Sequence, residues 1–483
     1  LALDCGSSSL ETIAWLRGRG VDVVVLDHHA VAAAGAAHPA VAHLNPAACG
    51  GGAVGGLDGT GDRGDRGDLG DLSDLRRMSA SGLAYLFCEA LAEDLRVAAW
   101  DRDAGLLLAA VGTVADVMPL RGTNRALVKR ALRLAADGAL ARLPGLAALH
   151  ETSATSAIDV RTLGFQWGPR LNAPGRIEDA AHPVDLLLAD DLETARPLAQ
   201  RCQAANRQRQ ELTRDIEAEA LRIASERLRE HPAETVLVLG APQWHPGIVG
   251  IVASRLRERF TRPVIVCGGH DDGTWKGSGR SLEGYDLGAE VRAAHEAGLL
   301  LRGGGHALAA GLAMEPERLE ALRVWLNGRS RLAPDDLVPH HEVLCEAAAV
   351  PSEDLQEWCD GPDPRQDGGQ LARFWTRVFD LLEPFGAGNP RPALLLRRAE
   401  LRWGPEPKRR KADQSVWALA AGFACGGSGL LFAEWTDLER AEACFVRGAR
   451  CDVVCSPTRS PRTGSGPEQY WYGWRVIEAE RCA

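Results

Sequence analysis

One aspartate and two histidines stand together at positions 27–29, directly after an apolar run. Carboxylate and imidazole side chains are suitable ligands for Mn²⁺ and similar divalent ions. Two such ions, ~3.5–4 Å apart, can clamp a phosphodiester and activate water for in-line attack. Paired histidines also occur as ordinary surface residues, so Asp27, His28 and His29 alone leave both interpretations open.

Two further acidic residues are expected near this triplet. Asp4 ends an apolar run, and Asp116 interrupts the apolar stretch Val111–Leu120. The segments 1–4 and 21–27 have the pattern of parallel strands joined by a short helix, which places both strand ends at one edge of a sheet. A buried carboxylate without a partner is costly, so we expect Asp116 to be ligated or hydrogen-bonded.

A second group of residues has the chemistry to hold phosphate. Ser278 and Arg280 follow Gly277, which we interpret as a turn. The fork of an arginine side chain fits phosphate oxygens in a bidentate manner. An ordinary surface arginine after a turn is the alternative, and the residues alone do not decide between them.

A glycine run points to an anion in the same way. Gly304, Gly305 and His306 precede an apolar segment that we interpret as a helix from Ala307. Backbone N–H groups at a helix N-terminus attract anions. A plain tight turn is the competing interpretation.

Basic residues elsewhere suggest a path for a nucleic-acid strand. Arg170, Asn172 and Arg176 lie in a segment with proline and glycine that we interpret as a loop. The basic run 408–411 lies in the same region as the aromatic residues of 470–474, and charge with stacking can hold single-stranded DNA. Solvated loops and the core of a β-barrel are the alternatives.

These residues need a scaffold of the α/β class. The pattern predicts two α/β domains joined by one long helix over 192–231, which is apolar on one face only. The last ~100 residues change to short alternating strands, which indicates an oligonucleotide-binding (OB)-like β-barrel. We therefore expect a first α/β domain, a linking helix, a second α/β domain, and a linker with the barrel, at residues 1–190, 191–232, 233–334 and 335–483.

More local expectations come from caps and apolar runs. Ser8 and Glu11 have the spacing of a capping box, which predicts that a helix begins there. The β-branched run 21–26 predicts a buried parallel strand. Helices are also expected at 79–94 and 104–114, and buried strands at 236–239 and 264–267.

Composition limits the class of protein. The 483 residues are 45% hydrophobic and carry a formal net charge of −10, which argues against coating of nucleic acid by bulk charge but allows a local basic path. Residues 50–77 are rich in Gly, Asp and Arg, which predicts a solvated insertion. Twelve cysteines at scattered spacings, with no bilayer-length apolar run and no secretory signal, predict reduced thiols in a cytoplasmic protein.

Several motifs resemble those of one known family. The first four resemble motifs of the DHH phosphoesterase superfamily in order and spacing: Leu3–Gly6, Leu26–His29, Leu44–Pro46 and Val111–Asp116. Five more are similar to the RecJ family within it: Pro169–Arg176, Trp244–Gly250, Gly277–Ser281, Gly304–Ala307 and Glu383–Pro390. The resemblance covers nearly the whole chain.

The resemblance implies roles for these residues. Asp4, His28 and Asp116 would bind metal, Asp27 would orient the imidazoles, and His29 would face the scissile phosphate. Ser278 and Arg280 would clamp a 5′ phosphate. The cofactor implied is Mn²⁺ or Mg²⁺, with two ions in the complete enzyme.

The activity implied is 5′-to-3′ hydrolysis of single-stranded DNA to 5′-mononucleotides in recombination and repair. Single-strand-binding protein and a RecQ-type helicase would be partners of a monomeric enzyme. The family's first motif, an Asp-x-Asp pair, has no counterpart here, so we expect a fragment that binds metal weakly and has little activity. A non-catalytic DNA-binding scaffold and a DHH phosphodiesterase for short oligonucleotides or cyclic dinucleotides are the alternatives.

Overall fold

The computed structural model describes most of the first two thirds of the chain and parts of the remainder. The described residues are 1–29, 38–46, 72–153, 158–270, 272–337, 382–391, 394–409, 416–424, 430–435, 450–461 and 470–481, with single residues between 441 and 448. None of the helices among them combines the length and the apolar character needed to cross a bilayer.

The chain divides into two compact units. Unit 1 comprises Leu1–Arg142, Thr155–Gln166 and Glu342–Ala483, and unit 2 comprises Leu143–Ala154 and Trp167–His341. The expected boundary at residue 190 therefore differs from the division in the structure. The long helix expected as a separate linker belongs to unit 2.

Unit 1 begins with a small parallel sheet. Its strands are β1 (Ala2–Leu3), β2 (Val24–Leu26) and β3 (Ala42–Leu44), in the order β1-β2-β3. The parallel pairing of the first two confirms the expected strand–helix–strand arrangement, although β2 is shorter than the apolar run. Helix α1 (Leu10–Arg17) has Ser9 as N-cap without a side-chain hydrogen bond, so the expected capping box is not formed.

Helices make up the rest of the described N-terminal part of unit 1. They are the 3₁₀ turns η1 (Leu72–Arg77) and η2 (Ala139–Arg142), with helices α2 (Ala80–Asp94), α3 (Arg102–Ala115) and α4 (Gly122–Ala136). Helices α2 and α3 confirm the two expected helices, and each bound lies within two residues of its expected position. Their starts are capped by Ser79, which accepts from Gly82 N, and by Asp101, which accepts from Ala104 N.

The Glu383–Pro390 motif packs on this helical part of unit 1. Leu120 N donates to Ala387 O (2.7 Å), and a Cβ at Gly386 would lie 2.7 Å from the Leu120 side chain. Glycine at Gly386 therefore permits the close approach, which gives this motif a structural role.

Unit 2 contains short helices followed by one very long helix. They are α5 (Pro144–Glu151), α6 (Gly168–Asn172), α7 (Pro174–Ile177), α8 (Ala181–Leu187) and α9 (Leu192–Glu230). The π-helical turn η3 (Thr162–Trp167) belongs to unit 1 up to Gln166 and precedes α6. Helix α9 has 39 residues, which confirms the helix expected over 192–231. Asp191 caps its start by accepting from Thr194 N, and Ile216 and Ala220 bury one face.

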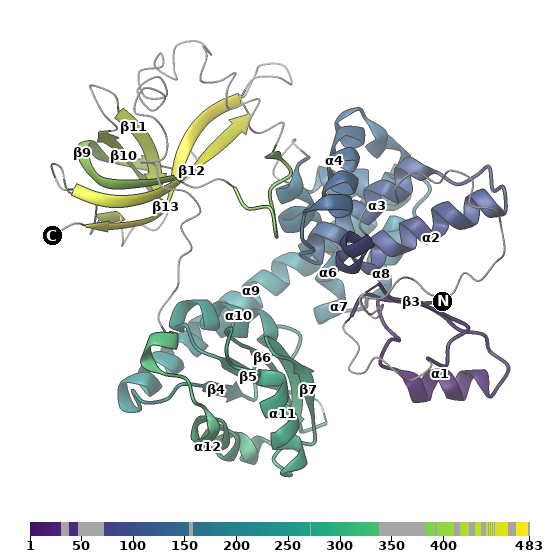
Figure 1. Cartoon of the computed structure of the whole chain (residues 1–483), viewed down its shortest axis with the longest axis horizontal. Helices are drawn as coiled ribbons and strands as arrows, with labels where there is room; N and C mark the ends of the chain where they lie inside the picture. The colour runs from purple at the N-terminus through teal and green to yellow at the C-terminus, as the bar shows by residue number, and fades with distance from the viewer. Residues whose placement is uncertain are drawn as a thin grey trace. The chain divides into compact units, whose positions relative to one another are not determined.

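A five-stranded mixed sheet follows α9. The elements are β4 (Leu237–Ala241), α10 (Val249–Phe260), β5 (Val264–Gly269), β6 (Trp275–Arg280), α11 (Leu287–Glu296), β7 (Arg302–His306), β8 (Ala309–Met314), η4 (Pro316–Arg318), α12 (Leu319–Arg329) and η5 (Pro334–Leu337). The strand order is β4-β5-β6-β8-β7. Helices α9 and α10 bury one face of the sheet, and α11 and α12 bury the other (Figure 1).

The C-terminal part of unit 1 is a ring of five strands. They are β9 (Leu394–Arg409), β10 (Val416–Ala424), β11 (Leu430–Trp435), β12 (Arg450–Pro461) and β13 (Tyr470–Arg481). The ring closes in the order β10-β11-β13-β12-β9. The side chains of the basic run 408–411 and of the aromatic residues 470–474 lie outside the described part, as does most of the expected insertion at 50–77.

Candidate metal centre and phosphate-binding surface

The small sheet of unit 1 brings the candidate metal ligands to one edge. The parallel ladder continues past the strands, because Asp4 N donates to Leu26 O (3.0 Å) and Asp27 N donates to Leu44 O (3.1 Å). The backbone φ of Asp4 is +61°, which turns the chain at the end of β1. The three strands therefore end together, and polar residues follow each of them.

One imidazole nitrogen meets two carboxylates at this edge. The Nε2 atom of His28 lies 3.1 Å from Asp4 Oδ1 and 3.3 Å from Asp116 Oδ2. A single N–H cannot donate well to two acceptors at once, so the arrangement favours a cation among the three groups. The structure therefore brings together the three residues predicted as ligands.

Asp116 differs from the expectation of a buried carboxylate. Its side chain is 47% exposed, because the residue is the C-cap of α3 and not part of its apolar interior. Partial burial and the charge of Asp4 raise the pKa of Asp116, against the opposing effect of His28. The negative end of the helix dipole also disfavours a carboxylate here, so a bound cation would relieve several unfavourable interactions.

Asp27 is buried behind the two histidines. Its Oδ1 atom accepts from His29 Nδ1 (2.6 Å), and its Oδ2 atom accepts from Ser7 N (3.0 Å). Burial alone would raise the pKa of Asp27, but hydrogen bonds from His29 and Ser7 outweigh it and hold the pKa well below its usual range. Asp27 orients the imidazole of His29 and contacts His28 only through the backbone N–H (2.8 Å).

Asp27 holds His29 through Nδ1 only, so the other ring nitrogen, Nε2, does not take part in that hydrogen bond. The hydrogen bond to Asp27 raises the pKa of His29, although partial burial opposes the shift. Because Nδ1 is used by Asp27, Nε2 remains available as a donor. Half of the side chain is exposed, so a substrate can reach it.

Three residues with no predicted role complete the network. Asn45 Nδ2 donates to Ser7 Oγ (2.8 Å) and to His29 O (2.9 Å), and Ser7 Oγ lies 2.9 Å from His43 Nε2. Ser7 and Asn45 are almost fully buried. Their position after β1 and β3, at the same sheet edge as the Asp-His-His triplet, is the signal that could have identified them.

The donor set fits a divalent cation. The donor atoms of Asp4, His28 and His29 lie within 4.8 Å of one another, and this group shares Asp4 and His28 with the predicted set. His29 already contacts Asp27, whereas Asp116 contacts His28, so we favour Asp116 as the third ligand. Carboxylates with one imidazole suit Mn²⁺ and are compatible with Mg²⁺.

In unit 2, Ser278 and Arg280 lie on strand β6 and do not follow a turn, so the expected turn at Gly277 is wrong. Gly277 lies in the middle of β6. A glycine fits there because a Cβ would lie only 2.7 Å from Cys267 Sγ. Arg280 Nη1 donates to Ser278 Oγ (2.9 Å). Gly250 of α10 packs against both, since a Cβ there would approach Ser278 Oγ to 3.0 Å.

The glycine run does not precede a helix, so the expected anion site at a helix N-terminus is wrong. Gly304, Gly305 and His306 lie on β7, which forms an antiparallel hairpin with β8. Gly305 has φ +146°, and a Cβ there would lie 2.4 Å from Ala309 O. Gly305 thus permits close backbone pairing with β8, and the alternation of small residues in 302–314 is that of strands.

The strand register nevertheless places this run beside Ser278. Ser278 pairs with Gly311, and Gly311 pairs with Gly304 on the other side. In a sheet, paired residues direct their side chains to the same face. No atom of the described residues lies within 4 Å of a Cβ placed at Gly304 or Gly311, so an open strip extends from Ser278 along the sheet surface.

Positive charge gathers around Arg280. Burial lowers the pKa of Arg280, and the charges of Arg176 and Arg257 lower it further. In the described part of the chain no carboxylate forms an ion pair with Arg280 or Arg176. Uncompensated arginines beside an open strip favour an anionic ligand.

Arg170 and Asn172, which were expected with Arg176 to line the path of the DNA strand, do not belong to this group of arginines. Arg170 and Asn172 lie on α6, and Arg176 lies on α7, so the expected loop is wrong. Pro169 and Pro174 lie in the first turns of these two helices, where proline is tolerated. Arg170 is buried and donates to Thr152 O (3.3 Å), which is a structural contact. Asn172 is exposed, and Arg176 lies near Arg280.

Comparisons with known proteins agree with this arrangement. A family model described as "DHHA1 domain" matches residues 233–328. The single-stranded-DNA-specific exonuclease RecJ of Dickeya dadantii is 35% identical over 337 residues, covering 67% of this chain and 54% of that protein. A crystal structure of RecJ from Thermus thermophilus in complex with Mn²⁺ has a TM-score of 0.73 and 28% identity, covering 100% of this chain and 61% of that one.

For a second solved structure, the match covers a larger share of that structure's own chain. A crystal structure of exonuclease RecJ bound to manganese is 31% identical with a TM-score of 0.53, covering 69% of this chain and 75% of that one. The Asp-His-His edge and the DHHA1 domain together define a protein of the DHH superfamily type. The chain belongs to the RecJ family within it. It spans just over half the length of the curated relative above.

Proposed function

We propose that the protein is a metal-dependent exonuclease that hydrolyses single-stranded DNA from the 5′ end and releases 5′-mononucleotides. The convergence of Asp4, His28 and Asp116 on one point is the observation that carries this proposal. The names of its relatives support the substrate class. Helix α9 and the C-terminal strands favour an exonuclease over a smaller DHH phosphodiesterase, which lacks both.

The residues of unit 1 would prepare the phosphodiester for attack. Asp4, His28 and Asp116 would hold Mn²⁺ or Mg²⁺, which polarises phosphate and lowers the pKa of water when bound. Asp27 keeps Nδ1 of His29 engaged, so His29 presents Nε2 to the scissile phosphate as a donor. Ser7 and Asn45 hold Asp27 and the backbone of His29 in place.

The residues of unit 2 would recognise the 5′ end. Ser278 and Arg280 would bind a terminal phosphate, with Arg176 supplying further charge. The open strip at Gly304 and Gly311 would let the strand lie close to the sheet. Asn172 and His306, both exposed, would contact its backbone.

The C-terminal ring would contribute DNA binding as an OB-type barrel. Its cyclic order is first, second, third, fifth and fourth strand, with the third and fifth strands parallel, and a five-stranded ring of this kind is the architecture of that class. Single-strand-binding protein and a RecQ-type helicase are the proposed partners of a monomer. The described cysteines are all free thiols, which supports a cytoplasmic location.

The test uses the protein as its gene encodes it. Asp116→Ala and His28→Ala should each abolish Mn²⁺-dependent hydrolysis of a 5′-phosphorylated single strand and weaken Mn²⁺ binding measured by electron paramagnetic resonance. Affinity for the strand in EDTA should stay within a few-fold, because the arginines of unit 2 and not the ion would hold the backbone. Asp22→Ala, an exposed acid before β2, is the matched control. Near-normal turnover in either variant would refute the ligand assignment.

A further inference from the structure

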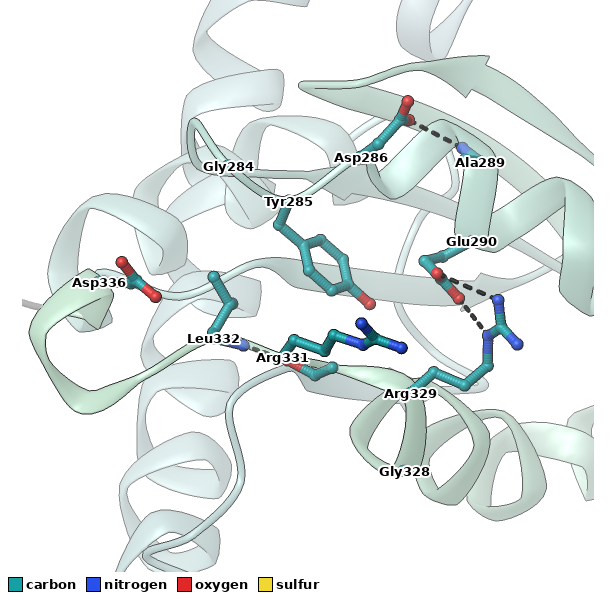
Figure 2. A pocket seen from close by; sticks show the side chains of 11 residues that line it. Gly284, Tyr285, Asp286, Ala289, Glu290, Gly328, Arg329, Arg331, Leu332 and Asp336 are labelled. Carbon is teal, nitrogen blue, oxygen red and sulfur yellow. Dashed lines mark hydrogen bonds and ion pairs between the residues drawn. The ribbon is translucent and has the colours of Figure 1, made fainter.

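A cavity of unit 2 lies apart from the strip that carries Ser278 and Arg280. Its volume is about 680 Å³. It is lined by the start of α11, the end of α12 and the segment that follows α12, through Gly284–Asp286, Ala289, Glu290, Gly328–Leu332 and Asp336. Figure 2 shows the side chains that surround it.

Two hydrogen-bond donors in this cavity lack an acceptor. Tyr285 is 7% exposed and its hydroxyl has no hydrogen-bond partner among the residues that the structure describes, although the ring packs in the core beneath α11 and α12. Arg331 forms no ion pair or hydrogen bond among the described residues. Both side chains point into the cavity (Figure 2). A buried hydroxyl without a partner is costly, so a ligand with acceptor atoms is expected there.

The other charges of the cavity are already engaged. Glu290 pairs with Arg329 (2.6 Å). Asp286 accepts from Ala289 N (2.8 Å) at the start of α11, and Asp336 accepts from Ala333 N (2.8 Å). Asp286 and Asp336 keep their negative charge without an ion pair among the described residues, and Arg331 is the lining cation that has none. Burial raises the pKa of Tyr285, so its hydroxyl remains a donor.

These features define the ligand by its chemistry. An oxyanion would accept from Arg331 and Tyr285, whereas the carboxylates of Asp286 and Asp336 each retain one oxygen for hydroxyl or amino groups. The cavity is much larger than a single phosphate ion needs. We propose that it binds a mononucleotide, with the phosphate at Tyr285 and Arg331 and with sugar or base donors at Asp286 and Asp336.

The choice of a mononucleotide over another phosphate ester rests on the proposed function, because 5′-mononucleotides are the product of that reaction. The cavity is distinct from the site of Ser278 and Arg280, so product held here would not compete directly with the 5′ end of the strand. Binding is measured without hydrolysis, which separates a failure of this proposal from a failure of the proposed function.

The experiment is calorimetry in EDTA with the Arg280→Ala protein, in which the 5′-phosphate site is disabled. Titration with deoxyadenosine 5′-monophosphate should show one site, whereas deoxyadenosine without phosphate should not bind. Adding Arg331→Gln or Tyr285→Phe should weaken binding roughly tenfold or more, because each removes a donor to a charged phosphate. Tyr285→Phe keeps the ring in the core, so it tests the hydroxyl without loss of packing.

Arg318→Gln is the matched control. Arg318 lies directly before α12, whose other end lines the cavity, but it is not itself among the lining residues. Its affinity should equal that of the Arg280→Ala parent. The proposal is overturned if the nucleotide does not bind, if deoxyadenosine binds as well as the nucleotide, or if Arg331→Gln and Tyr285→Phe both bind as the parent does.

Discussion

At the scale of single residues, Asp27 connects the stability of unit 1 to its chemistry. Its buried carboxylate accepts from Ser7 N and from His29, and neither bond requires a metal. A residue that is ordered before the ion arrives keeps His29 in position for the substrate. Preorganisation of this kind lowers the cost of assembling a site at the moment of reaction.

The pair of Asp27 and His29 predicts a pH window for stability. The pKa of Asp27 is lowered, so its contribution is complete above its ordinary value of about 3.9 and is lost as pH falls through the folded value. The pKa of His29 is raised, so its contribution is complete below about 6.5 and is lost as pH rises through the folded value. Asp27→Asn should therefore cost most between roughly pH 4 and 6.5.

Urea unfolding of wild type and Asp27→Asn at pH 3, 5 and 8 tests this window. A loss of about 1.5–3 kcal/mol at pH 5 is expected, since hydrogen bonds to a charged group are removed from a buried site. Asp22→Asn is the control, because Asp22 is exposed. A loss that is the same at all three values would contradict the role of ionisation.

Arg280 makes a prediction about the end of the strand. A terminal phosphate carries up to one more negative charge than an internal diester, so an arginine fork binds it more strongly. Arg280→Ala should lower the affinity for 5′-phosphorylated oligonucleotides about ten- to a hundredfold more than the affinity for 5′-hydroxyl ones. This range corresponds to the roughly 1.5–3 kcal/mol that a hydrogen bond to a charged group contributes. Arg280→Lys should recover only part of the preference because it loses the fork.

The measurement is the affinity of the three proteins for matched oligonucleotides at one salt concentration. Equal losses on both substrates would show that Arg280 only steadies the backbone of the strand.

At the scale of elements, the sequence predicted structure well where the signal was local and repeated. Helix α9 was predicted within one residue of its end, because apolar residues recur along one face. The structure adds that Asp191 caps its start. The glycine run at 303–306 was misassigned, since small residues before an apolar segment occur at helix starts and in strands alike. Only the pairing of β7 with β8, which depends on the rest of the sheet, distinguishes the two.

The same distinction applies to the candidate metal centre. Asp4 and His28 were predicted to meet because strand ends in a parallel sheet lie at one edge, and they do. Asp116, the C-cap of α3, was predicted to join them from the family resemblance, and it also meets His28. The contacts of Ser7 with His43 and Asn45 span 36 and 38 residues. The positions of these residues at the strand ends indicate the sheet edge, but which side chains pair across it depends on the packing of distant segments, so they were predicted without a role.

Two adjacent glycines of β7 should respond differently to substitution. Gly305→Ala should destabilise unit 2 by about 1–3 kcal/mol, because φ is +146° and the new Cβ would meet Ala309 O. Gly304→Ala should leave stability nearly unchanged, since its Cβ meets no atom of the described residues within 4 Å. Gly304→Leu should fold but bind a 5′-phosphorylated strand less tightly.

Thermal unfolding and strand affinity, measured on the same three variants, separate fold from binding. A Gly304→Leu protein with unaltered affinity would show that the strand does not lie over this strip.

At the scale of the whole molecule, net charge and local charge have opposite signs. The protein carries −10 overall, yet Arg176, Arg257 and Arg280 lie within electrostatic range of one another. DNA binding should therefore depend on a few local contacts. The affinity should fall as the salt concentration rises, by an amount set by the number of those contacts. Each phosphate contact to a single strand contributes about −0.7 to the slope of log affinity against log salt.

Loss of one contacting arginine should change that slope by a similar amount. Arg176→Gln should make it shallower by about 0.7, whereas Arg229→Gln, at the exposed end of α9, should leave it unchanged. Affinities measured from low to moderate salt on wild type and both variants provide the test. An unchanged slope for Arg176→Gln would place this arginine outside the DNA contact.

The open strip at Gly304 and Gly311 limits how this surface can vary. Glycine is the smallest residue, so every substitution at either position adds atoms above the sheet. Many single mutations can narrow the strip, and none at these positions can widen it. Random mutation therefore acts on this surface in one direction only, and its present width is the upper bound of what these two positions can provide.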